Sequence, residues 1–177
     1  ALDLIIEHHF VQFNDCVWQV KKGLGQGLSV SGAFFDWLFY RMVEHNLVDS
    51  NISLNAYGVL GYLRFRDDII FHAVSSGAVV QFTNKLKAAA GFFIIEVEEV
   101  ARQQVHFLDL CVVMSYASFY TKVYSKPTAI AVMLDSKSSH IKHIHDGWPR
   151  NEVLRVVKSC SFVRDAGVAI SGLFGRL

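Results

Sequence analysis

Two adjacent carboxylates, Asp67 and Asp68, stand between apolar segments and are the clearest candidates for chemistry. The flanking segments, Tyr62–Phe65 and Ile69–Phe71, predict two strands joined by a tight acidic turn. Neighbouring carboxylates repel each other and lose solvation unless a cation or water relieves them. Carboxylate oxygens bind Mg²⁺, which supports nucleotidyl transfer. A plain solvated turn also explains the pair, because Asp is common in turns.

A second candidate is the glycine-rich segment Lys21–Ser31, which precedes a helical apolar period from Ala33 to about Asn46. Glycines before a helix let the backbone approach another chain, and the helix N-terminus favours anionic groups. The segment is not a Walker loop, because no Gly-Lys-Ser/Thr sequence closes it. Ser29 or Ser31 is the expected N-cap of the helix. By itself this segment predicts no more than a loop.

The order of these two features resembles the palm of reverse transcriptases. A Gly-x-x-x-Gly-x-x-x-Ser loop and its helix come first, and a strand–Asp-Asp–strand hairpin follows later in the chain. Four further segments are similar to the region after the palm in Penelope-like reverse transcriptases: Phe107–Leu110, Thr121–Thr128, Ser139-His140 and Trp148–Glu152 with Arg155 and Ser159. The similarity runs from about Val17 to Ser161 and covers the C-terminal part of such an enzyme.

This resemblance implies roles for named residues. Asp67 and Asp68 would be the catalytic ligands of Mg²⁺ in an RNA-directed DNA polymerase, and without catalysis no cofactor is expected. The residues that would position the template and the incoming nucleotide are Gly23, Gly25, Gln26, Gly27, Ser29 and Ser31. An RNA or DNA template–primer is the implied nucleic-acid partner.

The chain also departs from the family pattern. Gly32 stands where proline is common after the serine of the glycine loop, and Arg66 replaces a small or apolar residue before the aspartates. A palm polymerase also needs a third carboxylate from an earlier strand, and Asp3, the only early candidate, is expected at the surface. The chain therefore resembles the back half of a polymerase, and we do not expect activity from it alone.

Charge is balanced overall but not along the chain. The 17 Lys and Arg residues face 16 Asp and Glu residues, so no general basic field for nucleic acid exists. Residues 121–164 are different, with eight basic and three acidic side chains. Lys126, Lys142 and Arg155 are the candidates for contact with a nucleic-acid backbone. A solvated charged face is the alternative interpretation of the same residues.

Three histidines, His140, His143 and His145, lie at spacings that resemble metal ligands. A zinc site would need more ligands than this segment offers, since only Asp146 lies near. A basic loop facing nucleic acid and an ordinary exposed loop remain open as alternatives.

Composition limits the class of protein. The 177 residues are 52% hydrophobic with a formal net charge of +1, which excludes a disordered chain and suits a globular one. No apolar window approaches the ~18 residues of a membrane span, and no signal peptide is visible. Three scattered cysteines favour a reducing, intracellular compartment over a disulfide framework. The chain begins at Ala1 and is either trimmed or a piece of something longer.

The elements that would hold these residues predict an α+β fold, with an antiparallel palm-type sheet packed on helices. Expected extended segments are 11–20, 59–74, 92–97, 105–113 and 119–124; expected helices are 2–10, 33–46, 75–90 and 151–163. Residues 1–120 would form a partial palm. Residues 121–177 would form the connection to the thumb, with an irregular basic segment and a thumb-like helix.

Two functions from different classes remain open. The chain is either part of a reverse transcriptase whose third carboxylate comes from elsewhere, or a domesticated, non-catalytic structural subunit of a larger protein or RNA–protein assembly. The high apolar content predicts that one edge of the sheet beside Tyr62–Phe71 is exposed or covered by another chain.

Overall fold

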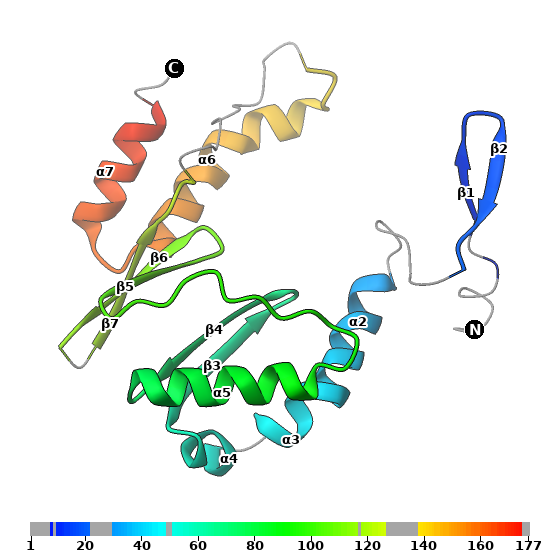
Figure 1. The fold of residues 1–177 in the computed structure, drawn as a ribbon. Helices are drawn as coiled ribbons and strands as arrows, with labels where there is room; N and C mark the ends of the chain where they lie inside the picture. Colours follow the sequence, from blue (N-terminus) through cyan, green and yellow to red (C-terminus); the bar gives the residue numbers. More distant parts are fainter. Residues whose placement is uncertain are drawn as a thin grey trace. The chain divides into compact units, whose positions relative to one another are not determined.

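The computed structural model describes residues 8, 10–21, 30–48, 51–116, 118–126 and 138–174, with the backbone alone for residues 51–53 and 174. These residues form a mixed α+β fold with small antiparallel sheets, which confirms the predicted fold class at that level (Figure 1). The chain divides into two compact units, Ala1–Glu96 and Val97–Leu177. The division at residue 120 rests on sequence motifs and stays a prediction.

The first unit begins with a hairpin of β1 (Phe10–Phe13) and β2 (Cys16–Gln19). Its turn is the Asn14-Asp15 pair, and Asn14 has a positive φ of 52°. Asn tolerates this left-handed conformation better than most residues. The helix predicted over residues 2–10 falls mostly outside the described residues, and its last residue, Phe10, belongs to β1 instead.

A continuous helical segment follows, as the periodicity predicts. It comprises α2 (Ser31–Phe39), a π-helical turn η1 (Tyr40–Glu44) and α3 (His45–Leu47). The predicted cap at Ser31 is wrong, because Val30 occupies the N-cap and Ser31 is the buried first residue of the helix. The other predicted cap, Ser29, lies outside the described residues. The short helix α4 (Asn51–Ala56) leads into the next strand.

The central element of this unit is the hairpin of β3 (Val59–Phe65) and β4 (Asp68–Ala73), which confirms the predicted strand–turn–strand. Helix α5 (Ser76–Ala89) lies against one face of the hairpin (Figure 1). Its N-cap is Ser75, whose Oγ accepts a hydrogen bond from the amide of Ala78. The core is centred on Phe82, which is fully buried and contacts aromatic rings of both strands.

Residues 92–97 do not form the predicted strand, although their pattern is that of one. Phe93 and Ile95 pack on the core, whereas Phe92 and Ile94 are 64% and 87% exposed. A strand needs a hydrogen-bonded neighbour, and the described residues pair no strand with this segment. The inside–outside alternation was therefore predictable, but the missing partner was not.

The second unit contains a three-stranded antiparallel sheet of β5 (Gln104–Phe107), β6 (Leu110–Ser115) and β7 (Ser118–Val123), in that order. Residues 105–113, predicted as one strand, belong to two strands, β5 and β6. The chain turns between them at Leu108-Asp109, where Leu108 has a φ of 56°. The strand predicted over residues 119–124 is confirmed as β7.

Two helices, α6 (Lys142–Ser159) and α7 (Val163–Phe174), complete this unit. The predicted start at residue 151 is wrong, since α6 begins nine residues earlier and contains Pro149. Between the helices, the amide of Ser161 donates to the carbonyl of Thr121, and Ser161 Oγ accepts from the Thr121 amide at 2.9 Å. Among the described helices, none is long and apolar enough to cross a membrane.

Candidate functional site

The acidic turn between β3 and β4 is only two residues long. Phe65 pairs directly with Asp68, so Arg66 and Asp67 form the connection and Asp68 already belongs to the strand. Arg66 adopts a positive φ of 58°, which is uncommon for a residue with a side chain. Asp67 and Asp68 are exposed at the end of the hairpin, as the predicted acidic turn implies.

One stripe of the preceding helix faces this hairpin. Gly32, Asp36, Tyr40 and Glu44 follow one another at four-residue intervals, which aligns Gly32 and Asp36 on one face of α2. Tyr62 and Arg64 alternate along β3 and therefore project from the same side of the strand. Glu44 bonds to Tyr62 and Arg64, and Asp36 bonds to Arg64 and Arg66. Helix and strand are thus joined along their length by polar side chains.

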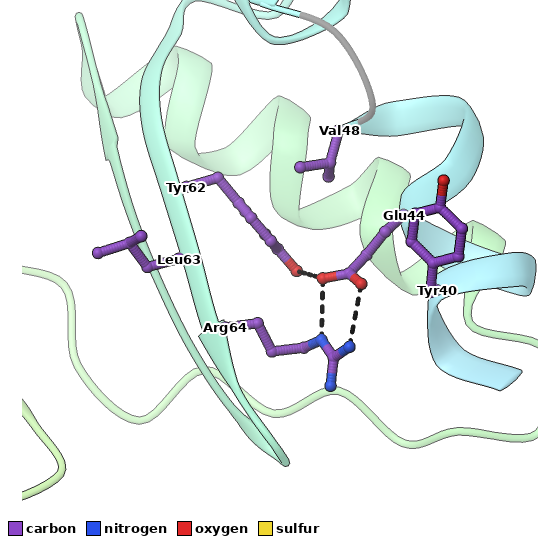
Figure 2. A pocket seen from close by; sticks show the side chains of 6 residues that line it. All are labelled: Tyr40, Glu44, Val48, Tyr62, Leu63 and Arg64. Carbon is purple, nitrogen blue, oxygen red and sulfur yellow. Dashed lines mark hydrogen bonds and ion pairs between the residues drawn. The ribbon is translucent and has the colours of Figure 1, made fainter. Parts of the chain in front are cut away.

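The inner part of this contact is a cluster of the buried Glu44 with the partly buried Arg64 and Tyr62 (Figure 2). Arg64 donates from Nε to Glu44 Oε1 at 2.9 Å and from Nη2 to Oε2 at 3.1 Å. The hydroxyl of Tyr62 donates to Glu44 Oε1 at 2.9 Å. These groups line an open hollow of about 370 Å³ with Tyr40, Val48 and Leu63. Since Glu44 is only 7% exposed, it depends on these donors.

Burial and charge perturb two groups in this cluster. Burial raises the pKa of Tyr62 far above its usual value, and the carboxylate of Glu44 raises it further. Burial lowers the pKa of Arg64, but its hydrogen bonds and ion pairs with Glu44 and Asp36 outweigh that effect and raise it. Tyr62 therefore remains a neutral donor and Arg64 a cation at physiological pH.

The outer part of the contact lies beside the acidic turn. Asp36 accepts from Arg64 Nη1 at 2.8 Å and from Arg66 Nη1 at 2.6 Å, one arginine on each carboxylate oxygen. Arg64 Nη1 also donates to the backbone carbonyl of Arg66 at 2.8 Å. The guanidinium of Arg64 lies 5.0 Å from the ring centre of Phe39. The turn that carries Asp67 is thereby fixed to the first turns of α2.

Asp67 and Asp68 themselves take no part in this network. In the described residues, neither side chain has a hydrogen bond or ion pair. They fit the oxygen chemistry of a divalent cation, which favours exposed carboxylates. However, the described ranges hold no group of three or more His, Cys, Asp and Glu side chains arranged to bind a metal. Asp67 and Asp68 are two candidate ligands, and the remaining coordination of a cation would have to come from elsewhere.

Most of the predicted positioning residues cannot be placed. Gly23, Gly25, Gln26, Gly27 and Ser29 lie outside the described residues. Ser31 is described as the buried start of α2, one residue before Gly32. Because Arg66 reaches this first turn, the structure brings the start of the helix and the acidic turn together.

The three basic candidates belong to the second unit and differ from one another. Lys126 and Lys142 are exposed. Arg155 donates to both carboxylate oxygens of Glu152 and forms an ion pair with Asp109. Hydrogen bonds to Glu152 raise the pKa of Arg155 most, followed by those to Asp109, against the opposing effect of burial. Arg155 thus holds the β5–β6 turn against α6.

The histidine segment has a local arrangement of its own. Ser138 Oγ lies 3.0 Å from His140 Nδ1 and 3.4 Å from His145 Nε2, and the two imidazole rings meet edge to face. His143 lies in the first turn of α6, outside this contact. A zinc site gains no support from the part of the chain that the structure describes.

Sequence reasoning missed the network of Asp36, Glu44, Tyr62, Arg64 and Arg66. A signal existed in the four-residue spacing of acids on the helix and the two-residue spacing of arginines before the turn. Relating these two spacings would have required knowing that helix and strand lie side by side.

Comparison with known proteins returns no match to a protein-family model, a curated protein or a solved structure. The function must therefore be argued from the geometry of the site.

Proposed function

We propose that the chain is the palm and thumb region of a reverse-transcriptase-like, RNA-directed DNA polymerase. The observation that carries the proposal is the short turn that exposes Asp67 and Asp68 at the end of a hairpin, fixed to the helix that follows the glycine-rich segment. This is the order and arrangement that the sequence resemblance implies. The proposed partner is a template–primer, and a further chain or segment would supply the third carboxylate.

In this proposal, Asp67 and Asp68 hold Mg²⁺, which activates an attacking hydroxyl and neutralises phosphate charge when bound. The remaining tasks fall to the chain itself. Arg66 and Asp36 keep the turn beside the start of α2. Arg64 and Arg66 together balance the charges of Asp36 and Glu44, so that these acids do not add negative charge to the site. Lys126 and Lys142 are proposed to contact the nucleic-acid backbone.

Primer extension on an RNA template tests this function, with the full chain in Mg²⁺ alone and together with any co-purifying partner. We expect extension only together with a partner that supplies the third carboxylate, and Asp67→Asn should abolish it, because one of the two carboxylate ligands of this chain is lost. Glu98→Gln is the matched control, since Glu98 is an exposed carboxylate outside the site. Lack of extension from a stable stoichiometric complex would overturn the proposal.

The second candidate is a non-catalytic structural subunit, and a specific feature favours it. Leu63 and Phe65 are 68% and 58% exposed. The Leu63 side chain points away from Tyr62 and Arg64 (Figure 2), and Phe65, two residues further along β3, lies on the same face as Leu63. An apolar face of this kind is typical of a surface that another chain covers. A Leu63→Ser, Phe65→Ser double variant should then lose the complex and keep its fold, whereas Ile94→Ser should keep both. Asp67-dependent extension would reject this candidate.

A further inference from the structure

The acidic turn also approaches α2 at the residue with the smallest side chain, Gly32. The guanidinium of Arg66 lies over Gly32, and a Cβ atom added at Gly32 would collide with Arg66 Nη1 and lie 3.0 Å from Cζ. Gly32 and Asp36 are one helical turn apart on the same face. The Arg66 guanidinium thus occupies the space that a side chain at Gly32 would fill, while it binds the carboxylate of Asp36.

Nothing else about Gly32 requires glycine. It is the second residue of α2, and its backbone is not in the left-handed conformation. In a helix, glycine is less favourable than alanine because it loses more backbone freedom on folding. Its advantage at this position is the space it leaves for the guanidinium. Arg66, for its part, occupies a left-handed backbone conformation that its own side-chain contacts help to hold.

We infer that Gly32, Asp36 and Arg66 form a latch that positions the Asp67–Asp68 turn against the start of α2. Arg66 is a positioning residue that acts through the turn. Only the role of the latch rests on the proposed function: it would fix cation-binding carboxylates relative to the segment before α2. Its geometry stands independently of catalysis.

A double-mutant cycle tests the latch as a physical coupling, with urea unfolding of the full chain as the measurement. Gly32→Ala should change the unfolding midpoint less favourably in the wild-type background than in an Arg66→Ala background, because the new methyl group displaces Arg66 from Asp36. In an Arg66→Ala background the same change should raise the midpoint, because only the gain in helix propensity remains. A shift of the same sign and size in both backgrounds would overturn the latch.

The chain offers a matched control for this cycle. Gly77 is the second residue of α5, just as Gly32 is of α2, and a Cβ at Gly77 would meet only Ser75 Oγ at 3.7 Å. Gly77→Ala should therefore raise the midpoint equally with and without Arg66. A lowered midpoint for Gly77→Ala would show that helix position, and not the contact with Arg66, explains the result at Gly32.

Paramagnetic broadening by Mn²⁺ tests the positioning role. In the ¹⁵N-labelled full chain, Mn²⁺ should broaden the amides of residues 67–69 and those of residues 32–36. In Gly32→Ala, which changes no charge, broadening at 67–69 should persist and that at 32–36 should weaken. Unchanged broadening at both places would overturn the positioning role. Absence of broadening at 67–69 in the wild type would instead reject the cation site of the proposed function, and the unfolding cycle would still decide the latch.

Discussion

Each unit of the chain ties a hairpin to a helix through one arginine between two carboxylates. In the first unit, Arg64 of β3 binds Asp36 and Glu44 of the helix. In the second, Arg155 of α6 binds Glu152 of its own helix and Asp109 of the β5–β6 turn. The chemistry is the same, but the Arg64 side chain is 13% exposed and that of Arg155 is 40% exposed.

This difference in burial determines how much stability is lost when one partner of each cluster is removed. Water screens an exposed pair and can solvate either partner when the other is removed. A buried carboxylate such as Glu44 has no such alternative, so removing its cation leaves an uncompensated charge. The first cluster should therefore be essential to its unit, whereas the second should be nearly dispensable.

The largest effect is expected from Arg64→Met, which keeps the apolar stem and removes the charge. We expect the free energy of unfolding of the first unit to fall by about 3 kcal/mol, because Glu44 stays buried without its cation. Urea unfolding measures the loss, and hydrogen exchange assigns it to residues of the first unit. A change below about 1 kcal/mol would place this cluster in the same class as the exposed one.

A smaller effect with a distinct pH dependence is expected from Tyr62→Phe. Near neutral pH the change should reduce stability by about 1 kcal/mol through the lost hydrogen bond to Glu44. Because the folded state raises the pKa of Tyr62, its contribution is complete below the usual pKa near 10 and is lost as pH rises above it.

Urea unfolding between about pH 8 and pH 11 measures this dependence. The wild type should lose stability with a slope that approaches 1.4 kcal/mol per pH unit from this residue, and the difference between wild type and Tyr62→Phe isolates it from the other tyrosines. The two curves should therefore converge as pH rises. Parallel curves would show that Tyr62 is not perturbed by burial beside Glu44.

The smallest effect is expected from Arg155→Met, the same substitution in the second unit. Its ion pairs with Asp109 and Glu152 are partly exposed, so the free energy of unfolding should change by less than about 1 kcal/mol. Urea unfolding under the conditions used for Arg64→Met gives the direct comparison. A loss as large as that of Arg64→Met would mean that burial does not distinguish the two clusters.

The sequence predicted those elements whose pattern is complete within a short window. The helix after the glycine-rich segment, the hairpin around Asp67 and helix α5 each carry their own period and turn residues. Failures came where a distant partner decides the outcome. Residues 92–97 alternate like a strand without a paired neighbour in the described part of the chain, and the turn at Leu108-Asp109 divides the largely apolar run of residues 105–113.

The candidate site divides in the same way. Asp67 and Asp68 were predictable as an acidic turn, because neighbouring residues define it. The role of Arg66 was not, since its contact with Gly32 joins positions 34 residues apart in the sequence. In the sequence, Gly32 and Arg66 stand out only as departures from the pattern of the family that the chain resembles. The structure shows that they are in contact, so each explains the other.

The π-helical turn η1 makes the length of the first helix as important as its charges. A π-helix closes its hydrogen bonds one residue later than an α-helix, so η1 accommodates an additional residue between Asp36 and Glu44. Deleting one residue from η1 would leave Asp36 and Glu44 seven residues apart in a regular helix, so they would still share a face and could both reach Arg64. Inserting one further residue would instead rotate the two ends of the helix relative to each other by about 100°. Such an insertion would separate the two acids as effectively as a mutation of either one.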